Sequence, residues 1–428
     1  MLDLRLIREQ PDMVRDALRR LNTDAPLDDI LQLDEQRRSL LTRVEELKAQ
    51  RNAGSKEIGK AAAGQERDKK IAEMRQLGDT IAELDEKVRD VDERLHKLLL
   101  EVPNLPDPDV PDGPDESANV IVRHWGDPKE PSDSIAPHWD LAENQGLIDF
   151  ERGVKVSGSR FYFLRADMAR LQRALITWMI DIHTREHDYI ELTPPVLVRS
   201  ESMVGTGNLP KFGDTLYHDE ESDLWLIPTA EVSVTNYHRD ELLDAGTLPR
   251  KYVAQSLCFR REQFSAGRDV RGIKRVHQFE KVEMVKFVEP EKSDDELYSL
   301  LDNAEQILRK LELPYRVVQM CTGDLSFVSA KKIDLEVWAP GSEDWLEVSS
   351  CANFRDFQAR RANIRFRTED GGRPQYVHTL NGSGLALPRT MIAILENYQQ
   401  PDGSIVVPDV LRGYLGGQEL IEKQPGIW

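Results

Sequence analysis

The sequence lacks the features that mark membrane and secreted proteins. No apolar run approaches the roughly 18 residues that a membrane-spanning helix needs. Charged and apolar residues alternate from the N-terminus onward, so we expect no signal peptide. The cysteines are Cys258, Cys321 and Cys351, which lie far apart and form no Cys-x-x-Cys pair. Isolated thiols of this kind are typical of reduced cysteines in a cytoplasmic protein without a membrane partner.

Two common ligand motifs are missing or incomplete. The sequence contains no GxxxxGK[ST], which excludes a P-loop. Residues 382–386 read GSGLA, one residue short of the GxGxxA pattern, and no βαβ pattern surrounds them, so they are a weak sign of nucleotide binding. His183 and His187 are spaced for one face of a helix, yet no HExxH motif or third ligand accompanies them. We therefore expect these histidines to pack at a helix end, and we predict no zinc site.

Positive charge is outnumbered by negative charge. The chain has 57 Lys+Arg against 76 Asp+Glu, a formal net charge of -19. This balance argues against nonspecific binding of nucleic acid over the whole surface. A local basic cluster in so acidic a chain is therefore a stronger sign of an anion-binding site. Two such clusters stand out. Residues 48–75 hold eight Lys or Arg and four acids, and residues 259–280 hold five arginines, one lysine and three acids.

Residues 28–100 show a helical pattern in two halves. In the second half, apolar residues recur at spacings of three and four, which predicts a heptad seam. The seam residues are Met74, Leu77, Ile81, Leu84, Val88, Val91, Leu95 and Leu98. The first half repeats the pattern with Arg37 and Arg51 at seam positions, and residues 59–67 interrupt it with two glycines. We expect two helices of about 30–35 residues, folded into an antiparallel coiled-coil hairpin about 45–50 Å long.

The first basic cluster lies around the expected turn of this hairpin and has a net charge of +4. One interpretation is a solvated surface, as in many coiled coils. The other is a binding surface for a polyanion, because phosphates attract clustered lysines and arginines. The cations concerned are Lys48, Arg51, Lys56, Lys60, Arg67, Lys69, Lys70 and Arg75.

A proline-rich segment divides the chain. Residues 103–118 contain five prolines, so they form neither a helix nor a central strand, and we interpret them as a linker. The linker separates an N-terminal domain, residues 1–102, from a larger domain, residues 119–428. The larger domain mixes a long helical segment with grouped strand-like segments rather than regular βαβ units. This grouping predicts an α+β domain around an antiparallel sheet.

The second basic cluster covers the end of one strand-like segment, QSLCFRRE, the start of another, HQFEKVEMVKF, and the loop between them. An antiparallel ladder of these strands would place Arg260 and Arg275 beside each other, with Glu262 also on the ladder. Guanidinium groups pair with phosphates or carboxylates. Glu262 can accept from an exocyclic amine, and Phe279 offers an aromatic face to a base. This combination suggests a nucleotide lying on the sheet.

Several longer blocks now fall into a known order. The block PPVLVRSESMVGTGNLPKF contains Pro195, FRRE and RVHQFEKVEM flank the basic loop, and LNGSGLALPRTMIAILEN contains Arg389. These blocks resemble motifs 1, 2 and 3 of the bacterial-type seryl-tRNA synthetases, a family of class II aminoacyl-tRNA synthetases. The block LIPTAEVSVTNYHRDE resembles the serine-binding TxE loop of that family. The resemblance covers essentially the whole chain.

The resemblance implies a class II catalytic domain at residues 119–428, preceded by a tRNA-binding coiled-coil domain at residues 1–102. It implies that L-serine is activated with ATP to seryl-adenylate and pyrophosphate. The serine would then be transferred to the 3′ end of tRNA(Ser), and of tRNA(Sec) where that tRNA is present. ATP and Mg²⁺ are the implied cofactors. A homodimer formed through motif 1 around Pro195 is the implied assembly.

The resemblance also implies roles for single residues. Arg260 would hold the α-phosphate and the serine carboxylate, and Glu262 the adenine amino group. Phe279 and Arg389 would sandwich the adenine, and Arg275 with Arg389 would steady the β- and γ-phosphates. The implied ATP-binding residues are Arg260, Arg261, Glu262, Val276, Phe279, Glu347, Val348, Ser349, Ser350 and Arg389. Glu347 and Ser350 among them would bind Mg²⁺ through ATP.

The serine-binding residues follow from the same resemblance. Glu231 would bind the serine ammonium together with Thr229. Glu283 would hydrogen-bond the serine hydroxyl, so that alanine would leave a buried carboxylate without its partner. The implied set is Thr229, Ala230, Glu231, Arg260, Glu283, Asn381 and Ser383.

The chain departs from the family pattern at a few positions. Arg261, Gln263 and Phe264 replace small residues after the motif 2 arginine, and Ile333 and Ser326 replace an aromatic residue and a glycine. The resemblance implies that the motif 2 loop also contacts the acceptor end of the tRNA. We therefore expect these changes to alter the contacts with that end.

Two alternatives compete with the synthetase. An amino acid:carrier-protein ligase would lack the long basic coiled-coil hairpin that residues 28–100 of this sequence predict. A noncatalytic paralogue should have lost the core residues Arg260, Glu262 or Arg389, and all three are present.

Overall fold

The computed structural model describes residues 1–60, 63–262 and 271–423. The chain folds as two compact units. The first comprises Met1–Arg19 and Thr23–Pro103, and the second comprises Arg20–Asn22 and Asn104–Trp428. None of the helices in the described ranges is long and apolar enough to cross a membrane.

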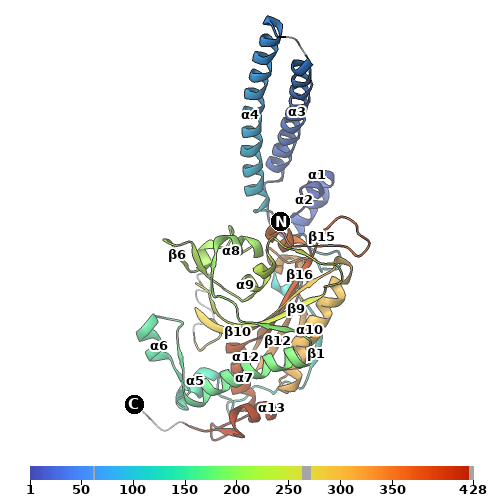
Figure 1. Cartoon of the computed structure of the whole chain (residues 1–428). Helices are drawn as coiled ribbons and strands as arrows, with labels where there is room; N and C mark the ends of the chain where they lie inside the picture. The colour runs from blue at the N-terminus through green and yellow to red at the C-terminus, as the bar shows by residue number, and fades with distance from the viewer. Residues whose placement is uncertain (61–62, 263–270, 424–428) are drawn as a thin grey trace. The chain divides into compact units, whose positions relative to one another are not determined.

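The first unit is helical, with a long antiparallel pair as its main feature (Figure 1). Its helices are α1 (Leu4–Glu9), α2 (Pro11–Arg20), α3 (Leu27–Lys60) and α4 (Gln65–Leu99). With 34 and 35 residues, α3 and α4 are each about 50 Å long at 1.5 Å per residue. The predicted hairpin is therefore confirmed. The connection predicted at residues 59–67 is shorter in the structure, because residues 59–60 still belong to α3 and residues 65–67 already belong to α4; residues 61–62 lie outside the described residues.

The seam between α3 and α4 contains both the predicted apolar residues and ion pairs. Val44 and Leu47 of α3 and Val88 of α4 are buried in it. Arg37, at a seam position in α3, forms an ion pair with Asp92 of α4. Charged residues at these positions therefore connect the helices rather than interrupting their contact.

The second unit is built on an eight-stranded sheet with the order β1-β11-β12-β13-β16-β10-β9-β4. All neighbouring pairs are antiparallel except β4 and β9. The strands are β1 (Val120–Trp125), β4 (Ile190–Leu192), β9 (Arg250–Phe259), β10 (Gln278–Val288), β11 (Tyr315–Gln319), β12 (Lys331–Ala339), β13 (Asp344–Asn353) and β16 (His378–Ala386). The α+β class with an antiparallel sheet is confirmed.

Three long helices cover one face of this sheet (Figure 1). They are α7 (Ala166–Arg185), α10 (Ser293–Lys310) and α12 (Leu387–Tyr398). Val282 and Met284 of β10 are buried against them, together with Ile333 of β12. The large core of the unit therefore lies between the sheet and these helices.

Shorter elements complete the second unit. They are α5 (His138–Asn144), β2 (Ile148–Asp149), α6 (Phe150–Ser157), β3 (Phe163–Leu164), β5 (Leu197–Arg199), α8 (Ser200–Thr206), β6 (His218–Asp219), β7 (Leu224–Leu226), α9 (Glu231–Thr235), β8 (Leu242–Leu243), α11 (Phe357–Ala362), β14 (Arg365–Phe366), β15 (Gln375–Tyr376), β17 (Ile405–Val406), α13 (Asp409–Arg412) and β18 (Leu420–Ile421). A second apolar cluster, which includes residues of α9 and α11, packs on the opposite face of the sheet.

Strand alternation positions the site. Successive side chains of a strand point to opposite faces, so residues two apart share a face. In β10, Val282 and Met284 enter the core, whereas Phe279, Lys281 and Glu283 line a cavity on the other face. The site therefore lies on the face opposite the three long helices.

Candidate active site

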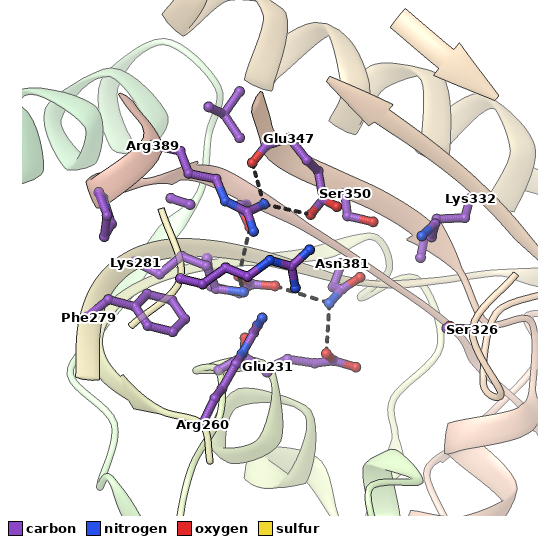
Figure 2. A pocket seen from close by; sticks show the side chains of 18 of the residues that line it. Glu231, Arg260, Phe279, Lys281, Ser326, Lys332, Glu347, Ser350, Asn381 and Arg389 are labelled. Carbon is purple, nitrogen blue, oxygen red and sulfur yellow. Dashed lines mark hydrogen bonds and ion pairs between the residues drawn. The ribbon is translucent and has the colours of Figure 1, made fainter. Parts of the chain in front are cut away.

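A cavity of about 320 Å³ opens on this face of the sheet, within the size range of small-molecule sites (Figure 2). Most of the residues predicted for ATP and serine line it. They are Thr229, Glu231, Arg260, Glu262, Arg275, Val276, Phe279, Glu283, Glu347, Val348, Ser350, Asn381, Ser383 and Arg389. The fold thus brings together side chains that are up to 160 positions apart in the sequence.

Three predicted residues lie outside the lining of this cavity. Ala230 is fully buried in the apolar cluster beside α9. The Ser349 hydroxyl is buried and donates to the carbonyl of Ser383 at 2.7 Å. The Arg261 guanidinium lies 5.5 Å from the centre of the Tyr217 ring. Their proposed contacts with ATP or serine remain predictions.

The placement of the basic residues on the strand ladder was predicted incorrectly. The β9–β10 ladder ends at the pair Phe259 and Gln278, so Arg260, Arg275 and Glu262 all lie beyond it. Glu262 has a φ of 47°, in the left-handed region, which a strand residue cannot adopt. The three side chains nevertheless line the same cavity, and Arg275 Nη1 lies 3.9 Å from Glu262 Oε2.

The arginines are held by backbone and aromatic contacts. The Arg260 guanidinium lies 5.1 Å from the centre of the Phe279 ring, and its Nε donates to the carbonyl of Pro228 at 3.4 Å. Arg389 donates from Nη1 to the carbonyl of Glu347 at 2.7 Å. Figure 2 shows both guanidinium groups facing into the cavity. Oriented cations of this kind match the phosphates of a nucleotide.

Strand pairing assembles a polar cluster at the floor of the cavity. β10 pairs with β16 in a register that places Glu283 opposite Ser383, after an irregularity between Val282 and Glu283. Asn381 Nδ2 donates to Glu231 Oε2 at 2.8 Å and to Glu283 Oε1 at 3.0 Å. Ser383 Oγ donates to Glu283 Oε2 at 3.5 Å. The two carboxylates are therefore joined through one amide.

Sequence reasoning missed Lys281 in this cluster. Its Nζ lies 2.5 Å from Glu283 Oε2, and the two side chains are 9% and 1% exposed. The period-two alternation Phe279, Lys281, Glu283 was the available signal, because it places all three on one face of β10. The Glu283 carboxylate thus already has a cationic partner without a serine hydroxyl.

Two further lysines of the lining were also missed. Lys274 forms an ion pair with Asp344, and Lys332 Nζ lies 3.6 Å from Asp334 Oδ2. Lys332 comes from β12 and is 72 residues from Arg260 in the sequence, and no role was predicted for it. The described cavity therefore holds more cations than the arginines that the motifs suggested.

Burial and like charge perturb the carboxyl groups. Burial, with the nearby Glu283, raises the pKa of Glu231 to about 7. Burial, with the nearby Glu347, likewise raises the pKa of Asp334 to about 7. For Glu347, burial favours the neutral acid, but the charges of Arg389 and Lys332 outweigh it and lower the pKa. Glu347 is therefore ionised at neutral pH, where Asp334 titrates.

The predicted magnesium ligands lie on β13. Glu347 Oε1 is 3.6 Å from Arg389 Nη1, and the Ser350 hydroxyl donates to Asp334 Oδ1 at 2.7 Å. Within residues 1–60, 63–262 and 271–423, no group of three or more His, Cys, Asp or Glu is arranged to hold a metal ion. A metal at this site would therefore need ligands from the substrate.

The remaining sequence expectations fall on different parts of the unit. The Nδ1 atoms of His183 and His187 are 3.0 Å apart, and burial lowers the pKa of His183 to about 3. Among the departures from the family pattern, Ser326 lines the cavity and Ile333 is buried in the core. Gln263 and Phe264 lie outside the described residues.

An antiparallel sheet that carries such a cavity between its motif 2 and motif 3 strands defines a class II aminoacyl-tRNA synthetase. The model for the tRNA synthetase class II core domain (G, H, P, S and T) matches residues 214–398. The model for the seryl-tRNA synthetase N-terminal domain matches residues 1–106.

Full-length relatives give the family. A serine–tRNA ligase of Thermomicrobium roseum is 71% identical, over 100% of this chain and 96% of the relative. A serine–tRNA ligase of Herpetosiphon aurantiacus is 58% identical, over 98% of this chain and 100% of the relative. The chain belongs to the seryl-tRNA synthetase family. The predicted family is confirmed, and the helical arm favours the synthetase over a carrier-protein ligase.

Solved structures agree with this assignment. Seryl-tRNA synthetase from Pyrococcus horikoshii, complexed with ATP, matches with a TM-score of 0.92 and 39% identity, over 99% of this chain and 100% of that chain. The cytoplasmic serine-tRNA ligase from Naegleria fowleri, in complex with AMP, matches with a TM-score of 0.88 and 32% identity, over 99% of both chains. Both likenesses span the two units.

Proposed function

We propose that this member of the seryl-tRNA synthetase family activates L-serine with ATP and transfers the serine to the 3′ end of tRNA(Ser). One observation carries the proposal: a single cavity combines oriented arginines, an aromatic face and a buried carboxylate cluster. The full-length relatives named serine–tRNA ligase support the same activity. By family resemblance we extend the substrate set to tRNA(Sec) where that tRNA is present.

For ATP, the cavity supplies positioning and charge rather than a nucleophile. The serine carboxylate attacks the α-phosphorus, so the protein needs to align the two and to stabilise negative charge on the phosphates. We assign Arg260 to the α-phosphate, and Arg275 with Arg389 to the β- and γ-phosphates. Phe279 and Arg389 would enclose the adenine ring, and Glu262 would accept from its amino group.

For serine, the carboxylate cluster supplies recognition at both ends of the small molecule. We assign Glu231 and Thr229 to the ammonium group. Glu283, Asn381 and Ser383 would bind the hydroxyl, with Lys281 paired to the Glu283 carboxylate. A buried charged network that is completed by a hydroxyl disfavours alanine, because alanine leaves polar groups unpaired.

The residues on β13 fit a magnesium ion carried by ATP. Glu347 is ionised and Ser350 offers a hydroxyl oxygen, and hard oxygen ligands suit Mg²⁺. Bound through ATP, the ion would neutralise charge on the phosphates. Glu347 and Ser350 would orient the nucleotide through it.

We assign the α3–α4 pair, which we call the helical arm, to tRNA binding. We also assign the protein to the cytoplasm.

We assign the motif 1 region around Pro195 to dimerisation. β4 is a terminal strand of the described sheet, and Ile190 and Leu197, on either side of Pro195, are 59% and 47% exposed. Exposed apolar residues beside an edge strand favour contact with a second copy. Light scattering at micromolar concentration should give twice the chain mass. A fully active monomer would contradict the dimer.

Serine-dependent exchange of pyrophosphate into ATP is the direct test of the activity. The purified chain should catalyse this exchange with serine and should show little exchange with alanine. Exchange that does not depend on serine, or none at all with folded protein, would contradict the proposed function.

A further inference from the structure

A buried histidine outside the cavity contacts the backbone segment that returns from the basic stretch to β10. His138, the first residue of α5, is 1% exposed. Its neighbour across the core is Glu396 of α12, whose side chain is fully buried. His138 belongs to no motif connected with ATP or serine, whereas Glu396 lies near the end of the motif 3 block, seven residues after Arg389, without an assigned role.

Glu396 determines the hydrogen-bonding state of this histidine. Its carboxylate accepts from the backbone N–H of His138 at 2.9 Å, from the backbone N–H of Ser342 at 2.8 Å and from the Ser342 hydroxyl at 2.5 Å. Burial alone would raise the pKa of Glu396, but the hydrogen bonds from His138 and Ser342 lower it. An ionised carboxylate only accepts hydrogen bonds, so His138 Nδ1, which lies 2.9 Å from Glu396 Oε1, must be the donor.

With Nδ1 as the donor, Nε2 is the ring nitrogen left to accept a hydrogen bond. The backbone N–H of Ile273 donates to this Nε2 at 3.2 Å. Ile273 is fully buried, so this N–H has no access to water as an alternative acceptor. Loss of Nε2 would leave a buried donor unpaired.

The contact also restricts the residue before Ile273. Gly272 has a φ of +75°, and a Cβ at this position would lie 2.0 Å from His138 Nε2. A side chain is excluded here both by the backbone conformation and by the ring. The backbone therefore lies directly against His138.

The restrained segment leads at once into the proposed ATP site. The carbonyl of Lys274, the next residue after Ile273, accepts from Arg389 Nε at 3.5 Å. Arg275 and Val276 follow, and both line the cavity. A shift of the backbone at Ile273 would therefore move three residues of the cavity and a contact of Arg389.

We propose that His138 is a positioning residue for ATP: its Nε2 holds the backbone at Ile273, which places Lys274, Arg275 and the partner carbonyl of Arg389 at the nucleotide. The proposal rests on the proposed function, because it assigns these residues to ATP. The serine-binding cluster lies on β10, β16 and α9 and makes none of these contacts. His138 should therefore affect ATP far more than serine.

Two substitutions test the roles of the two ring nitrogen atoms of His138 one at a time. His138→Asn places an amide N–H near the position of Nδ1, so it can still donate to Glu396, but it has no acceptor for Ile273. His138→Gln places an amide oxygen near the position of Nε2, so it can accept from Ile273, but it loses the donor to Glu396. If His138 only stabilises the fold through Glu396, Gln is the more harmful change. If His138 instead positions the backbone at Ile273 for ATP binding, His138→Asn is the more harmful change.

The experiment measures the KM for ATP, the KM for serine and kcat in pyrophosphate exchange, together with the melting temperature of each variant. We expect His138→Asn to raise the KM for ATP roughly tenfold to a hundredfold, the scale that a small misplacement of binding groups produces. The KM for serine should change less than about threefold, and His138→Gln should restore most of the ATP affinity. Equal ATP effects in both variants, or a larger effect in Gln, would overturn the proposal.

Gly272→Ala provides a second route if the histidine variants fail to fold. The added methyl group would push the backbone from His138 without touching Glu396, so the KM for ATP should rise while the KM for serine stays the same. An unchanged KM for ATP in this variant would also overturn the proposal. Absence of serine-dependent exchange in the unmodified chain would instead refute the proposed function, so the two failures are distinguishable.

Discussion

The two basic regions of this protein place their cations in opposite environments. On the helical arm, Lys56, Lys60 and Lys69 are exposed to solvent. In the cavity, Lys281 is buried and forms an ion pair with the buried Glu283. The same residue type thus serves as a solvated charge in one unit and as an oriented, desolvated group in the other.

This difference matches two kinds of anion. Exposed lysines gathered at one end of the helical pair suit a polyanion, which is bound by several weak, salt-sensitive contacts. Desolvated and oriented cations suit a small ligand, because each charge-assisted hydrogen bond is stronger and more directional away from water. A basic cluster in a sequence is therefore interpretable only when the environment of each charge is known.

Removing one oriented cation from the cavity should have the largest effect. In Arg389→Ala, the adenine and the phosphates lose a partner that the carbonyl of Glu347 holds in place at 2.7 Å. Pyrophosphate exchange should fall by about a hundredfold to a thousandfold, as when one donor is removed from a preorganised charge-binding site. Circular dichroism should show an intact fold. Exchange at the level of the unmodified chain would disprove the assigned role.

Deleting the helical arm should show that the arm and the cavity serve different steps of the reaction. Every residue of the cavity lining belongs to the second unit. Replacing residues 36–97 with a short glycine-containing bridge should therefore leave pyrophosphate exchange nearly unchanged, while aminoacylation of tRNA(Ser) collapses. The two assays on one preparation control for folding. Charging as efficient as that of the full chain would mean that the arm does not serve tRNA.

The pKa of Glu231 adds a pH dependence that the exposed arm should lack. Because burial and Glu283 raise the pKa of this carboxyl to about 7, Glu231 is neutral below that pH and ionised above it. The serine ammonium binds the ionised form, so the KM for serine should rise by up to about tenfold for each pH unit below 7. Glu231→Gln should weaken serine binding and remove this dependence. A KM for serine that is constant between pH 6 and 8 in the unmodified chain would contradict the assignment.

The smallest expected effect comes from single charges on the arm. Lys56 and Lys60 are exposed, whereas Lys48 forms an ion pair with Asp85, and Lys70 one with Glu57. Lys56→Gln with Lys60→Gln should lower the salt dependence of tRNA binding by about one unit of slope for each phosphate that the variant no longer neutralises.

The control for this test is Lys48→Gln with Lys70→Gln, which removes the same charge from the α3–α4 pair, one lysine from each helix. Its slope should change less, because those lysines are already paired within the arm. Equal changes in the two double variants would mean that only net charge matters, not direct contact with phosphates.

Much of the architecture was predictable because its signals are local. The three-and-four spacing of residues such as Val88 and Val91 predicted the hairpin, since each helix needs only its own apolar seam. Ile333, Leu335 and Val337 alternate with Asp334 and Glu336 in the sequence, which is the pattern of a half-buried strand, and all three are buried in β12. The motifs also placed most of the cavity, because the family resemblance carries the pairing of distant strands with it.

The rest depended on partners that no local pattern reveals. Lys332 enters the cavity because β12 pairs with β13, and Lys281 acquires its role because β10 and β16 pair in one register. Glu262 and Arg275 looked like ladder residues, but the ladder ends before them. His138 gave no sequence signal, since its two partners lie at Glu396 and Ile273, both more than 100 residues away.

By itself, the sequence determined the helical arm, the α+β class, the family and the identity of most cavity residues, because periodicity and motif order are properties of the chain. Only the tertiary structure decided which charges are buried, which are paired and what each histidine nitrogen contacts. Hydrogen bonds and desolvation depend on distances of a few ångströms between segments far apart in sequence. Such distances exist only once the sheet has formed, and they determine how each cation and carboxylate behaves.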